Sequence, residues 1–402
     1  MESSRFLPEQ AAPGKVRDRG LAALVERGRG AYNAKDGALF LLPQGRAERT
    51  VLREKLCFAL ESAGAVPVEG ATEEGHLRSL AERYLRDHPD RNAWASVEQG
   101  EIRLAAWCRE GEDASGLERV LVALTEEEKG NGAFRTFPET TPQGIRILWA
   151  APSSEGAGAG RPGLRCPSCG TLLGEDSPRE GAVRLEEGEE PGTLAEVTTP
   201  GATTIPELCR QLGIEAGRTL KTLVYSTPSG VAAALLRGDR ELSCPKLERA
   251  LGEPTERAAH DALVRFFGDV AGYCGPLGLP PEVRLLADRD LEGARNLVAG
   301  ANRRDTHVMG VCLGRDLTPP LADLGAWKAG DPCPDCGALL EEGTLRVLGT
   351  FELFDPGRSP EKPLVTANRE GKTERPRFWR GRIDLEALQL ALEEGTSPCG
   401  NA

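Results

Sequence analysis

Residues 218–239, RTLKTLVYSTPSGVAAALLRGD, decide the predicted fold of the middle of the chain. Two β-compatible runs, Thr219–Thr227 and Val231–Arg237, are separated by Pro228, Ser229 and Gly230. Short runs rich in β-branched and apolar residues that are joined by Pro, Ser and Gly are typical of a β-hairpin. The stretch therefore predicts two paired strands.

Helical and strand patterns alternate on both sides of this hairpin. Ile205, Leu208 and Leu212 recur at helical spacing behind the N-cap candidate Thr204, and Gly213 supplies a stop. Further predicted elements are a helix capped by Ser243 and strands at 283–287 and 308–313. Together they predict a compact mixed α/β domain of about 130 residues.

A repeated cysteine motif flanks this domain: Cys166-Pro-Ser-Cys169-Gly and Cys333-Pro-Asp-Cys336-Gly. Two thiolates two residues apart, followed by Gly, form a zinc knuckle, and two knuckles make a tetrahedral four-sulfur site. Such a site has no open position, so we expect Zn²⁺ here to be structural. Two unrelated surface turns, or a redox pair, are the alternatives.

The distance between the knuckles in the sequence predicts that the α/β domain is inserted between the two halves of one site. The stretch 151–163, APSSEGAGAGRPG, has the composition of a linker, and acidic residues near 186–190 indicate a solvated connector. The expected domains are 1–165 (scaffold, first part), 166–196 (knuckle and linker), 197–330 (inserted domain) and 331–402 (second knuckle and scaffold, second part).

Composition excludes several classes of protein. The 402 residues are 39% hydrophobic with a formal charge of -12, and no apolar run reaches the ~18 residues of a membrane span. The first residues have no basic and apolar signal pattern, so we expect a cytoplasmic protein without membrane contact. Eleven cysteines, an odd number, argue against a disulfide framework. The acidic charge excludes indiscriminate coating of RNA but leaves room for a local basic groove.

Eight short motifs follow one another in a specific order: TTPGATTIPEL, RTLKTLVY, LLRGDRELSCPKLE, GYCGPLGL, LADRDL, VAGANRRDTHVMGV, GRD and GDPCPDCG. In this order they resemble the editing (insertion) domain of bacterial prolyl-tRNA synthetases, which is also found as free-standing trans-editing proteins. The resemblance covers Val197 to about Leu353. Both flanks are similar to the class II scaffold of the same family, for example at GALFLLPQGRAERTVLREKLCFALESAGAVPVE.

The flanks depart from the family where ATP would bind. WASVEQGEIRLAAW lacks the F-R-x-E element of the second motif, and WRGRIDLEAL has Leu385 where the arginine of the third motif is expected. The proline-recognition loop is reduced to residues 71–74, and no anticodon-binding domain is expected. Losing an arginine that holds the phosphates removes orders of magnitude in rate. The expected fold is therefore mixed α/β: a degenerate, catalytically silent antiparallel-sheet scaffold interrupted by an α/β editing-type domain.

The resemblance also implies a set of site residues. Lys221 matches the family's functional lysine, placed to meet the terminal phosphate or the ester, and His307 is expected to contact substrate or water. Asp288 either contacts substrate or caps a helix near Leu291. Gly275 is expected to donate its N–H to the ester carbonyl. Further substrate-binding candidates are Arg237, Gly238, Asp239, Pro276, Gly300, Ala301 and Asn302.

Two other side-chain groups are ambiguous. Cys274 has no adjacent activating group, so we interpret it as a pocket-lining residue rather than a nucleophile. RNA contacts are expected at Arg303 and Arg304. The basic-aromatic cluster at 375–382 either contacts RNA or is a remnant of the scaffold's third motif folded into its sheet.

The predicted function is trans-editing: hydrolysis of the ester of mischarged tRNA for proline, with alanine as the expected acyl group. The expected partner is the acceptor end of aminoacylated tRNA, no ATP is required, and a homodimer could form through the scaffold. A non-catalytic sensor or regulator that binds an amino acid or tRNA is the first alternative. A residual proline-activating ligase is the second.

Overall fold

The computed structural model describes residues 19–27, 29–33, 38–41, 43–62, 66–67, 93–98, 101–108, 134–141, 144–153, 160–179, 190–268, 270–354, 366–367, 373–374 and 377–395. The chain divides into two compact units. The scaffold unit comprises Met1–Glu139, Ile145–Gly174 and Lys328–Ala402, and the inserted unit comprises Thr140–Gly144 and Glu175–Trp327. Within the described residues, no helix combines the length and apolar character needed to cross a membrane.

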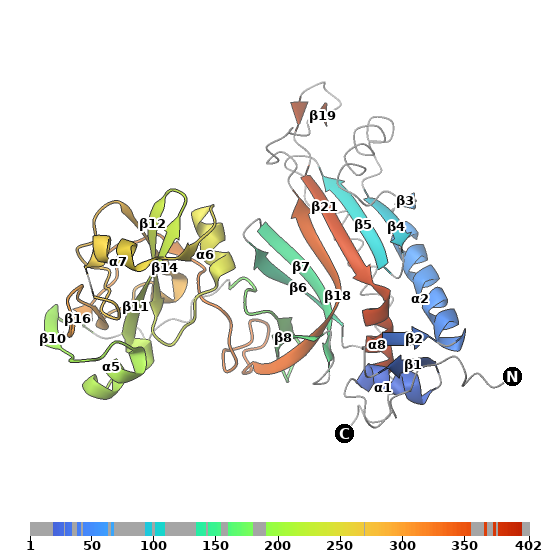
Figure 1. Cartoon of the computed structure of the whole chain (residues 1–402), viewed down its shortest axis with the longest axis horizontal. Helices are drawn as coiled ribbons and strands as arrows, with labels where there is room; N and C mark the ends of the chain where they lie inside the picture. Colours follow the sequence, from blue (N-terminus) through green and yellow to red (C-terminus); the bar gives the residue numbers. More distant parts are fainter. Residues whose placement is uncertain are drawn as a thin grey trace. The chain divides into compact units, whose positions relative to one another are not determined.

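The scaffold unit is built on a nine-stranded, mostly antiparallel sheet (Figure 1). Its main path has the order β3 (Val66–Pro67), β4 (Ala93–Glu98), β5 (Glu101–Cys108), β21 (Arg377–Asp384), β18 (Glu341–Phe354), β7 (Gly144–Ser153) and β6 (Arg135–Thr141). Strand β8 (Gly160–Arg165) pairs with β18 and with the short β9 (Leu172–Leu173). This antiparallel sheet agrees with the predicted class of the scaffold.

Two helices, α2 (Pro43–Ser62) and α8 (Leu385–Gly395), contribute to the core of this sheet. Leu56 of α2 and Leu388 of α8 are buried with Trp149 and Phe351 of the sheet. Asp384 caps α8, since its carboxylate accepts the N–H groups of residues 386 and 387. Smaller elements complete the unit: α1 (Arg19–Glu26), β1 (Gly30–Asn33), β2 (Ala38–Leu41), β19 (Thr366–Ala367) and β20 (Thr373–Glu374).

One local prediction for the scaffold unit was wrong. The predicted linker 151–163 is largely strand, because β7 continues to Ser153 and β8 begins at Gly160, while 154–159 lie outside the described residues. Both strands pair with β18, whose hydrogen bonds outweigh the low strand propensity of Gly and Pro. Strand β18 itself has a register shift between Val347 and Gly349 where it pairs with β7.

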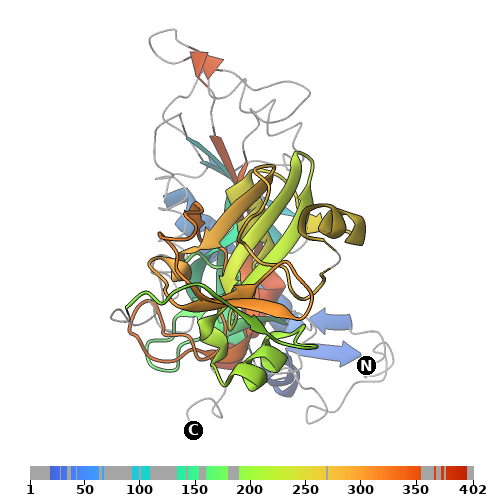
Figure 2. The same ribbon diagram turned by 90° about the vertical axis from the view of Figure 1, so that its left-hand side faces the viewer.

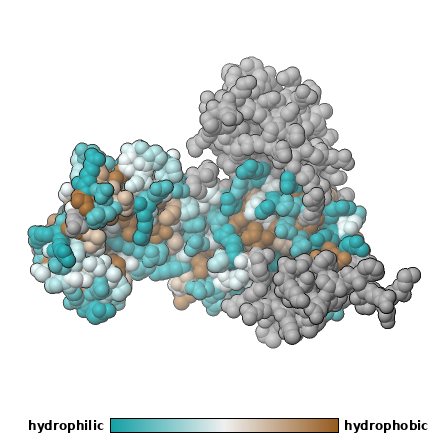
Figure 3. All heavy atoms as spheres, in the orientation of Figure 1, coloured by the Kyte–Doolittle hydropathy of each residue, from teal (hydrophilic) through white to brown (hydrophobic). Residues whose placement is uncertain are grey.

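The inserted unit contains an eight-stranded mixed sheet, turned toward the viewer in Figure 2. Its path is β10 (Ala195–Thr198), β16 (Thr306–Val311), β15 (Leu297–Gly300), β11 (Thr219–Thr227), β12 (Gly230–Arg237), β14 (Val283–Asp288) and β17 (Leu321–Ala322), while β13 (Glu256–Arg257) pairs with β11. Its α-helices are α5 (Ile205–Leu212), α6 (Cys244–Leu251) and α7 (His260–Phe267). Hydrophilic residues predominate on the face in Figure 3, with only scattered hydrophobic ones.

Most of the local sequence signals of this unit are confirmed, but the predicted helix near Leu291 is not. Strands β11 and β12 form the predicted hairpin, and β12 is buried from Val231 onward. Helix α5 begins with a capping box between Thr204 and Glu207 and ends at Gly213, whose φ of 66° is left-handed. The helix predicted near Leu291 is instead a single 3₁₀ turn, because the chain turns at Gly293 with a positive φ of 68°.

Candidate functional site

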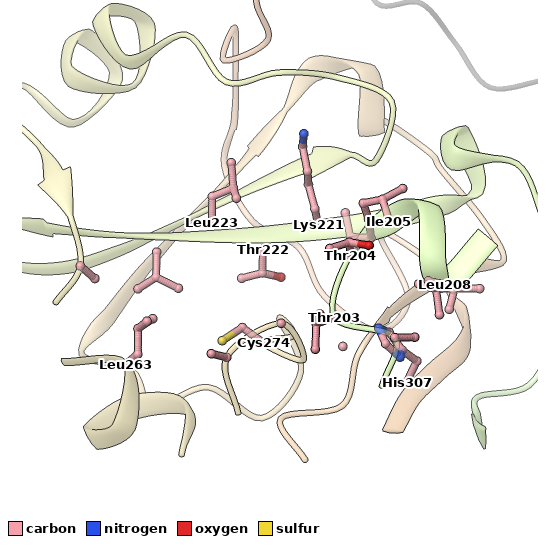
Figure 4. A pocket seen from close by; sticks show the side chains of 18 of the residues that line it. Thr203, Thr204, Ile205, Leu208, Lys221, Thr222, Leu223, Leu263, Cys274 and His307 are labelled. Carbon is pink, nitrogen blue, oxygen red and sulfur yellow. The ribbon is translucent and has the colours of Figure 1, made fainter. Parts of the chain in front are cut away.

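A cavity of about 460 Å³ lies in the inserted unit, along β11 and between β13 and β15. Its walls also include the start of α5, part of α7 and the loop that carries Gly272 and Cys274. Most of the lining is apolar, with a few polar groups converging from different elements, which is the usual composition of a small-molecule site. Figure 4 shows Thr222 and Cys274 on facing walls, with Thr203 and His307 at one end.

The cavity occupies a gap in the sheet. On this edge of β11, Leu220 pairs with β15 and Tyr225 pairs with β13. Among the described residues no strand pairs with β11 between these two positions. The peptide group of Thr222 lies inside this gap, so the cavity is bordered by backbone as well as by side chains.

Lys221, the predicted functional lysine, lines the cavity. Its Nζ lies 3.2 Å from Oε1 of Glu241, whose side chain is exposed. Successive side chains of a strand point to opposite faces, and in Figure 4 Lys221 extends away from Thr222 and Cys274. An exposed ion pair of this kind is weak, so the ammonium group can exchange Glu241 for another anion at the cavity's rim.

His307 also lines the cavity and is only 4% exposed. Its Nδ1 lies 2.7 Å from Oγ1 of Thr199, and its ring packs edge-on against Tyr273 with 5.5 Å between ring centroids. Burial lowers the pKa of His307, because desolvation disfavours the imidazolium ion. The imidazole is therefore neutral at pH 7, with one nitrogen occupied by Thr199.

The loop at Gly275 is held by Asn302. The N–H of Gly275 donates to Oδ1 of Asn302 at 2.7 Å, and Nδ2 of Asn302 donates to the carbonyls of Gly275 and Leu277. A Cβ at Gly275 would stand 1.7 Å from the carbonyl oxygen of Gly300, so only glycine permits this approach. The predicted donation from Gly275 to a substrate carbonyl is therefore not supported, because its N–H is already used.

Cys274 contributes a small apolar wall. Burial raises the pKa of its thiol, so the neutral form predominates at pH 7. Cys274 packs against the hydrophobic cluster that contains Phe267. A neutral thiol is a poor nucleophile, which agrees with the interpretation of Cys274 as a lining residue.

Asp288 does not line the cavity. Its buried carboxylate accepts the N–H groups of Leu324 at 2.8 Å and Gly325 at 2.6 Å, and its other oxygen caps the 3₁₀ turn through Asp290. Arg179 lies 3.7 Å from Asp288 and 2.6 Å from Asp290. Of the two predicted roles, the structure shows capping. Asp288 caps the 3₁₀ turn and also binds the backbone of residues 324 and 325, near the end of the inserted unit.

The remaining predicted substrate-binding residues divide into those inside and those outside the cavity lining. Gly300 is inside, while Arg237, Gly238, Asp239, Pro276, Ala301 and Asn302 are not lining residues. Arg237 forms a two-point ion pair with Asp239 at 2.6 and 2.7 Å. A Cβ at Gly238 would stand 1.8 Å from Oγ1 of Thr219, so this glycine serves close packing.

The two arginine clusters are already partly neutralised. Arg303 pairs with Glu196 at 2.5 Å. In the 375–382 cluster, Arg380 and Arg382 belong to β21 and pair with Glu352 and Glu101 at 3.6 and 3.5 Å. Arg375 lies outside the described residues. The structure therefore shows the described part of this cluster folded into the scaffold's sheet, the second of the two predicted alternatives.

The four knuckle cysteines meet in the scaffold unit. Sγ of Cys166 lies 3.4 Å from that of Cys336, Sγ of Cys169 lies 3.6 Å from that of Cys333, and all four lie within 4.8 Å of one another. Neighbouring sulfurs of a tetrahedral site with metal–sulfur distances of about 2.3 Å are about 3.8 Å apart. The donor set therefore fits a four-sulfur metal ion.

The two knuckles also share their backbone geometry. In each, the glycine after the second cysteine has a positive φ, 76° at Gly170 and 77° at Gly337, and donates its N–H to the carbonyl of the first cysteine. A hydrogen bond from Thr171 lowers the pKa of Cys169 to about 6. The pKa of the neighbouring Cys336 is raised instead, to about 12, so the ionised form in this close set of thiols is concentrated on Cys169. The thiolate is the form that binds metal.

Sequence reasoning missed three residues of the cavity region. Thr199 orients His307, and Thr222 has a buried hydroxyl oxygen with no hydrogen-bond partner within the described part of the chain. Asp305 accepts from the N–H of Gly201 and the hydroxyl of Tyr273, both at 2.8 Å. These contacts connect distant segments, so no local pattern indicated them.

Comparison with known proteins identifies the type of domain that contains this cavity. Residues 199–317 match the model of the aminoacyl-tRNA editing domain. The proline–tRNA ligase of Pelotomaculum thermopropionicum is 44% identical over 170 residues. Residues 199–317 therefore form an aminoacyl-tRNA editing domain, in a part of the chain that is similar to proline–tRNA ligases. The cavity, Lys221, His307 and Thr199 all lie in this editing domain.

The similarity to complete ligases is partial. The Pelotomaculum alignment covers 42% of this chain and 30% of that ligase. The proline–tRNA ligase of Maridesulfovibrio salexigens is 41% identical over 150 residues, which are 37% of this chain and 26% of that ligase. A solved structure described as a trans-editing enzyme for prolyl tRNA synthetase is 25% identical, with a TM-score of 0.30, over 33% of this chain and 86% of that chain.

Proposed function

We propose that the protein is an aminoacyl-tRNA deacylase that hydrolyses the ester of mischarged tRNA for proline, with alanine as the acyl group. The observation that carries the proposal is the small, largely apolar cavity of the editing domain, lined by Lys221 and by a neutral, oriented His307. An apolar cavity of this size suits a small side chain together with part of the terminal nucleotide.

The chemistry needs an attacking oxygen, a place for its proton and charge stabilisation at the carbonyl. Neutral His307, whose Nδ1 is held by Thr199, can accept or relay a proton. Lys221, at the rim and only weakly paired with Glu241, can meet a phosphate of the acceptor end. None of these steps uses ATP.

We propose that the four-cysteine site binds Zn²⁺ in a structural role. Four sulfur ligands satisfy a tetrahedral ion and leave no position for substrate. The site ties residues 166–169 to residues 333–336, immediately outside the inserted unit. When bound, the metal would crosslink the two chain segments through which the inserted unit joins the scaffold unit.

We propose that the scaffold unit does not activate proline. Leu385, at the position expected for an arginine of the third motif, is buried at the start of α8 in the core of the sheet. Arg380 and Arg382 are paired with glutamates. ATP–pyrophosphate exchange with proline tests the proposal: exchange above background would contradict it. Pairing of two chains through the scaffold stays a prediction that sedimentation can check.

A deacylation panel tests the main proposal. Purified protein should release alanine from Ala-tRNA(Pro) faster than it releases cysteine or proline from their esters with the same tRNA. Lys221→Ala should slow the release at least about 10-fold, whereas Lys221→Arg should retain part of the rate. Tight binding of the tRNA without turnover, unchanged by Lys221→Ala, would instead favour a non-catalytic sensor.

A further inference from the structure

We propose that Thr222 binds the aminoacyl group as if that group were one residue of a neighbouring strand. The inference rests on the proposed function of the cavity and names the contact that positions the substrate. It starts from the gap in the sheet, where β11 has no strand partner between Leu220 and Tyr225 within the described residues.

The direction of the Thr222 peptide group follows from the pairing on both edges of β11. The hairpin loop consists of two residues, with Thr227 opposite Gly230. Hydrogen-bonded pairs alternate along antiparallel strands, so residues 227, 225, 223 and 221 bond to β12 and Thr222 does not. On the other edge, the carbonyl of Val224 accepts the N–H of Ala258. Because residues two apart point the same way, the N–H and C=O of Thr222 both point into the gap.

The side chain of Thr222 adds a third polar atom. Its hydroxyl oxygen is buried and has no partner within the described residues. It faces the wall formed by Cys274 in Figure 4. A buried hydroxyl without a partner is costly, so a ligand that supplies one is favoured at this position. The cavity therefore presents the N–H donor, the C=O acceptor and the hydroxyl group, which can donate or accept, of a single residue.

An aminoacyl ester carries the complementary groups. Two residues in a hydrogen-bonded antiparallel pair each give an N–H and accept at a C=O. The α-ammonium group of the acyl residue can donate to the carbonyl of Thr222 and to its hydroxyl, while the ester carbonyl accepts the N–H of Thr222. This N–H replaces the donor that Gly275 cannot supply, since Gly275 is bound to Asn302.

The contact also defines the hydrolytic step. The attacking water oxygen forms a bond to the ester carbon, and the carbonyl electron pair moves to the oxygen that faces the N–H of Thr222. When the carbonyl re-forms, the C–O bond to the ribose breaks and its electron pair goes to the ribose oxygen. That oxygen takes up a proton equivalent to the one released by the water. The products are the free amino acid and tRNA.

Two substitutions at this position separate the hydroxyl from the N–H. Thr222→Val removes only the hydroxyl and should lower kcat/KM for Ala-tRNA(Pro) about 3- to 10-fold. Thr222→Pro also removes the N–H and should lower it by a further factor of about 100. Proline is tolerated in a strand where the N–H faces an open edge. The matched control is Leu223→Pro, which removes an N–H that bonds to β12. It should lower the melting temperature much more than Thr222→Pro does.

Binding of stable analogues keeps the inference separate from the proposed function. The probes are 3′-alanylamino-adenosine and its lactyl counterpart, in which a hydroxyl replaces the α-amino group, measured by calorimetry. The wild type should bind the alanyl analogue at least about tenfold more tightly, and Thr222→Val should reduce this preference. If the protein prefers the alanyl analogue in this way but does not hydrolyse Ala-tRNA(Pro), the deacylase proposal is contradicted and the role of Thr222 in binding is retained.

The inference is overturned by any of three results. These are equal affinity for the two analogues, no binding of either, or a folded Thr222→Pro variant as active as Thr222→Val. If Thr222→Pro does not fold, the inference is tested by the affinities of the wild type and of Thr222→Val for the two analogues. Deacylation of Ala-tRNA(Pro) with equal affinity for the two analogues would retain the proposed function and remove the role of Thr222.

Discussion

The hydroxyl of Thr199 lies 2.7 Å from Nδ1 of His307, and both side chains are buried. This hydrogen bond fixes the orientation of the imidazole ring. Thr199→Val removes it with little change in volume. We expect deacylation to fall about 10-fold and the acidic limb of its pH profile to shift, while the melting temperature changes little. A matched control is Thr227→Val in the hairpin turn, and equal effects of the two substitutions would contradict the role of Thr199.

Stability should depend on pH through His307. Burial holds its pKa below the ordinary value of 6.5, so near and below that pH the unfolded chain binds a proton that the folded chain does not. This group leaves the free energy of unfolding unchanged above about pH 7 and lowers it as the pH falls through 6.5. Urea unfolding between pH 5 and 8 should show this decline, and His307→Gln should flatten it.

Local signals in the sequence predicted the hairpin and α5, but not the gap that forms the cavity. The hairpin depends on Pro228 and Ser229, and α5 depends on the capping box at Thr204, all close in sequence. The gap exists because β13 has two residues and ends its pairing at Tyr225. A two-residue strand has no periodicity, so its partner and extent depend on tertiary packing.

For the site residues, too, the sequence indicated some features, whereas others depend on tertiary contacts. Motif resemblance singled out Lys221 and His307, and both side chains line the same cavity. It could not show that Asn302 occupies the N–H of Gly275, or that Asp288 binds Leu324 and Gly325. These hydrogen bonds join segments that are distant in sequence, and residue type alone does not distinguish a side chain that binds substrate from one that binds backbone.

The cysteine site predicts one metal ion per chain. Elemental analysis of protein purified without added chelator should find zinc at a ratio of about 1, and chelation should lower the melting temperature. Cys169→Ser should lose the metal, because three sulfurs and a hydroxyl bind it more weakly. Cys209→Ser, in α5 and outside the cluster, should retain it. Metal-free protein with unchanged stability would exclude a structural ion.

The ion pair between Lys221 and Glu241 predicts opposite effects at its two ends. Lys221→Ala removes a cation from the cavity's rim and should raise KM for Ala-tRNA(Pro) and lower kcat/KM at least about 10-fold. Glu241→Gln leaves the ammonium group 3.2 Å from a neutral partner, so its charge is freed for a phosphate and KM should fall or stay unchanged. The difference between the variants should shrink in high salt, because contacts with phosphate are screened. An equal loss of activity in both variants would indicate that the pair itself, rather than the free ammonium group, is needed for deacylation.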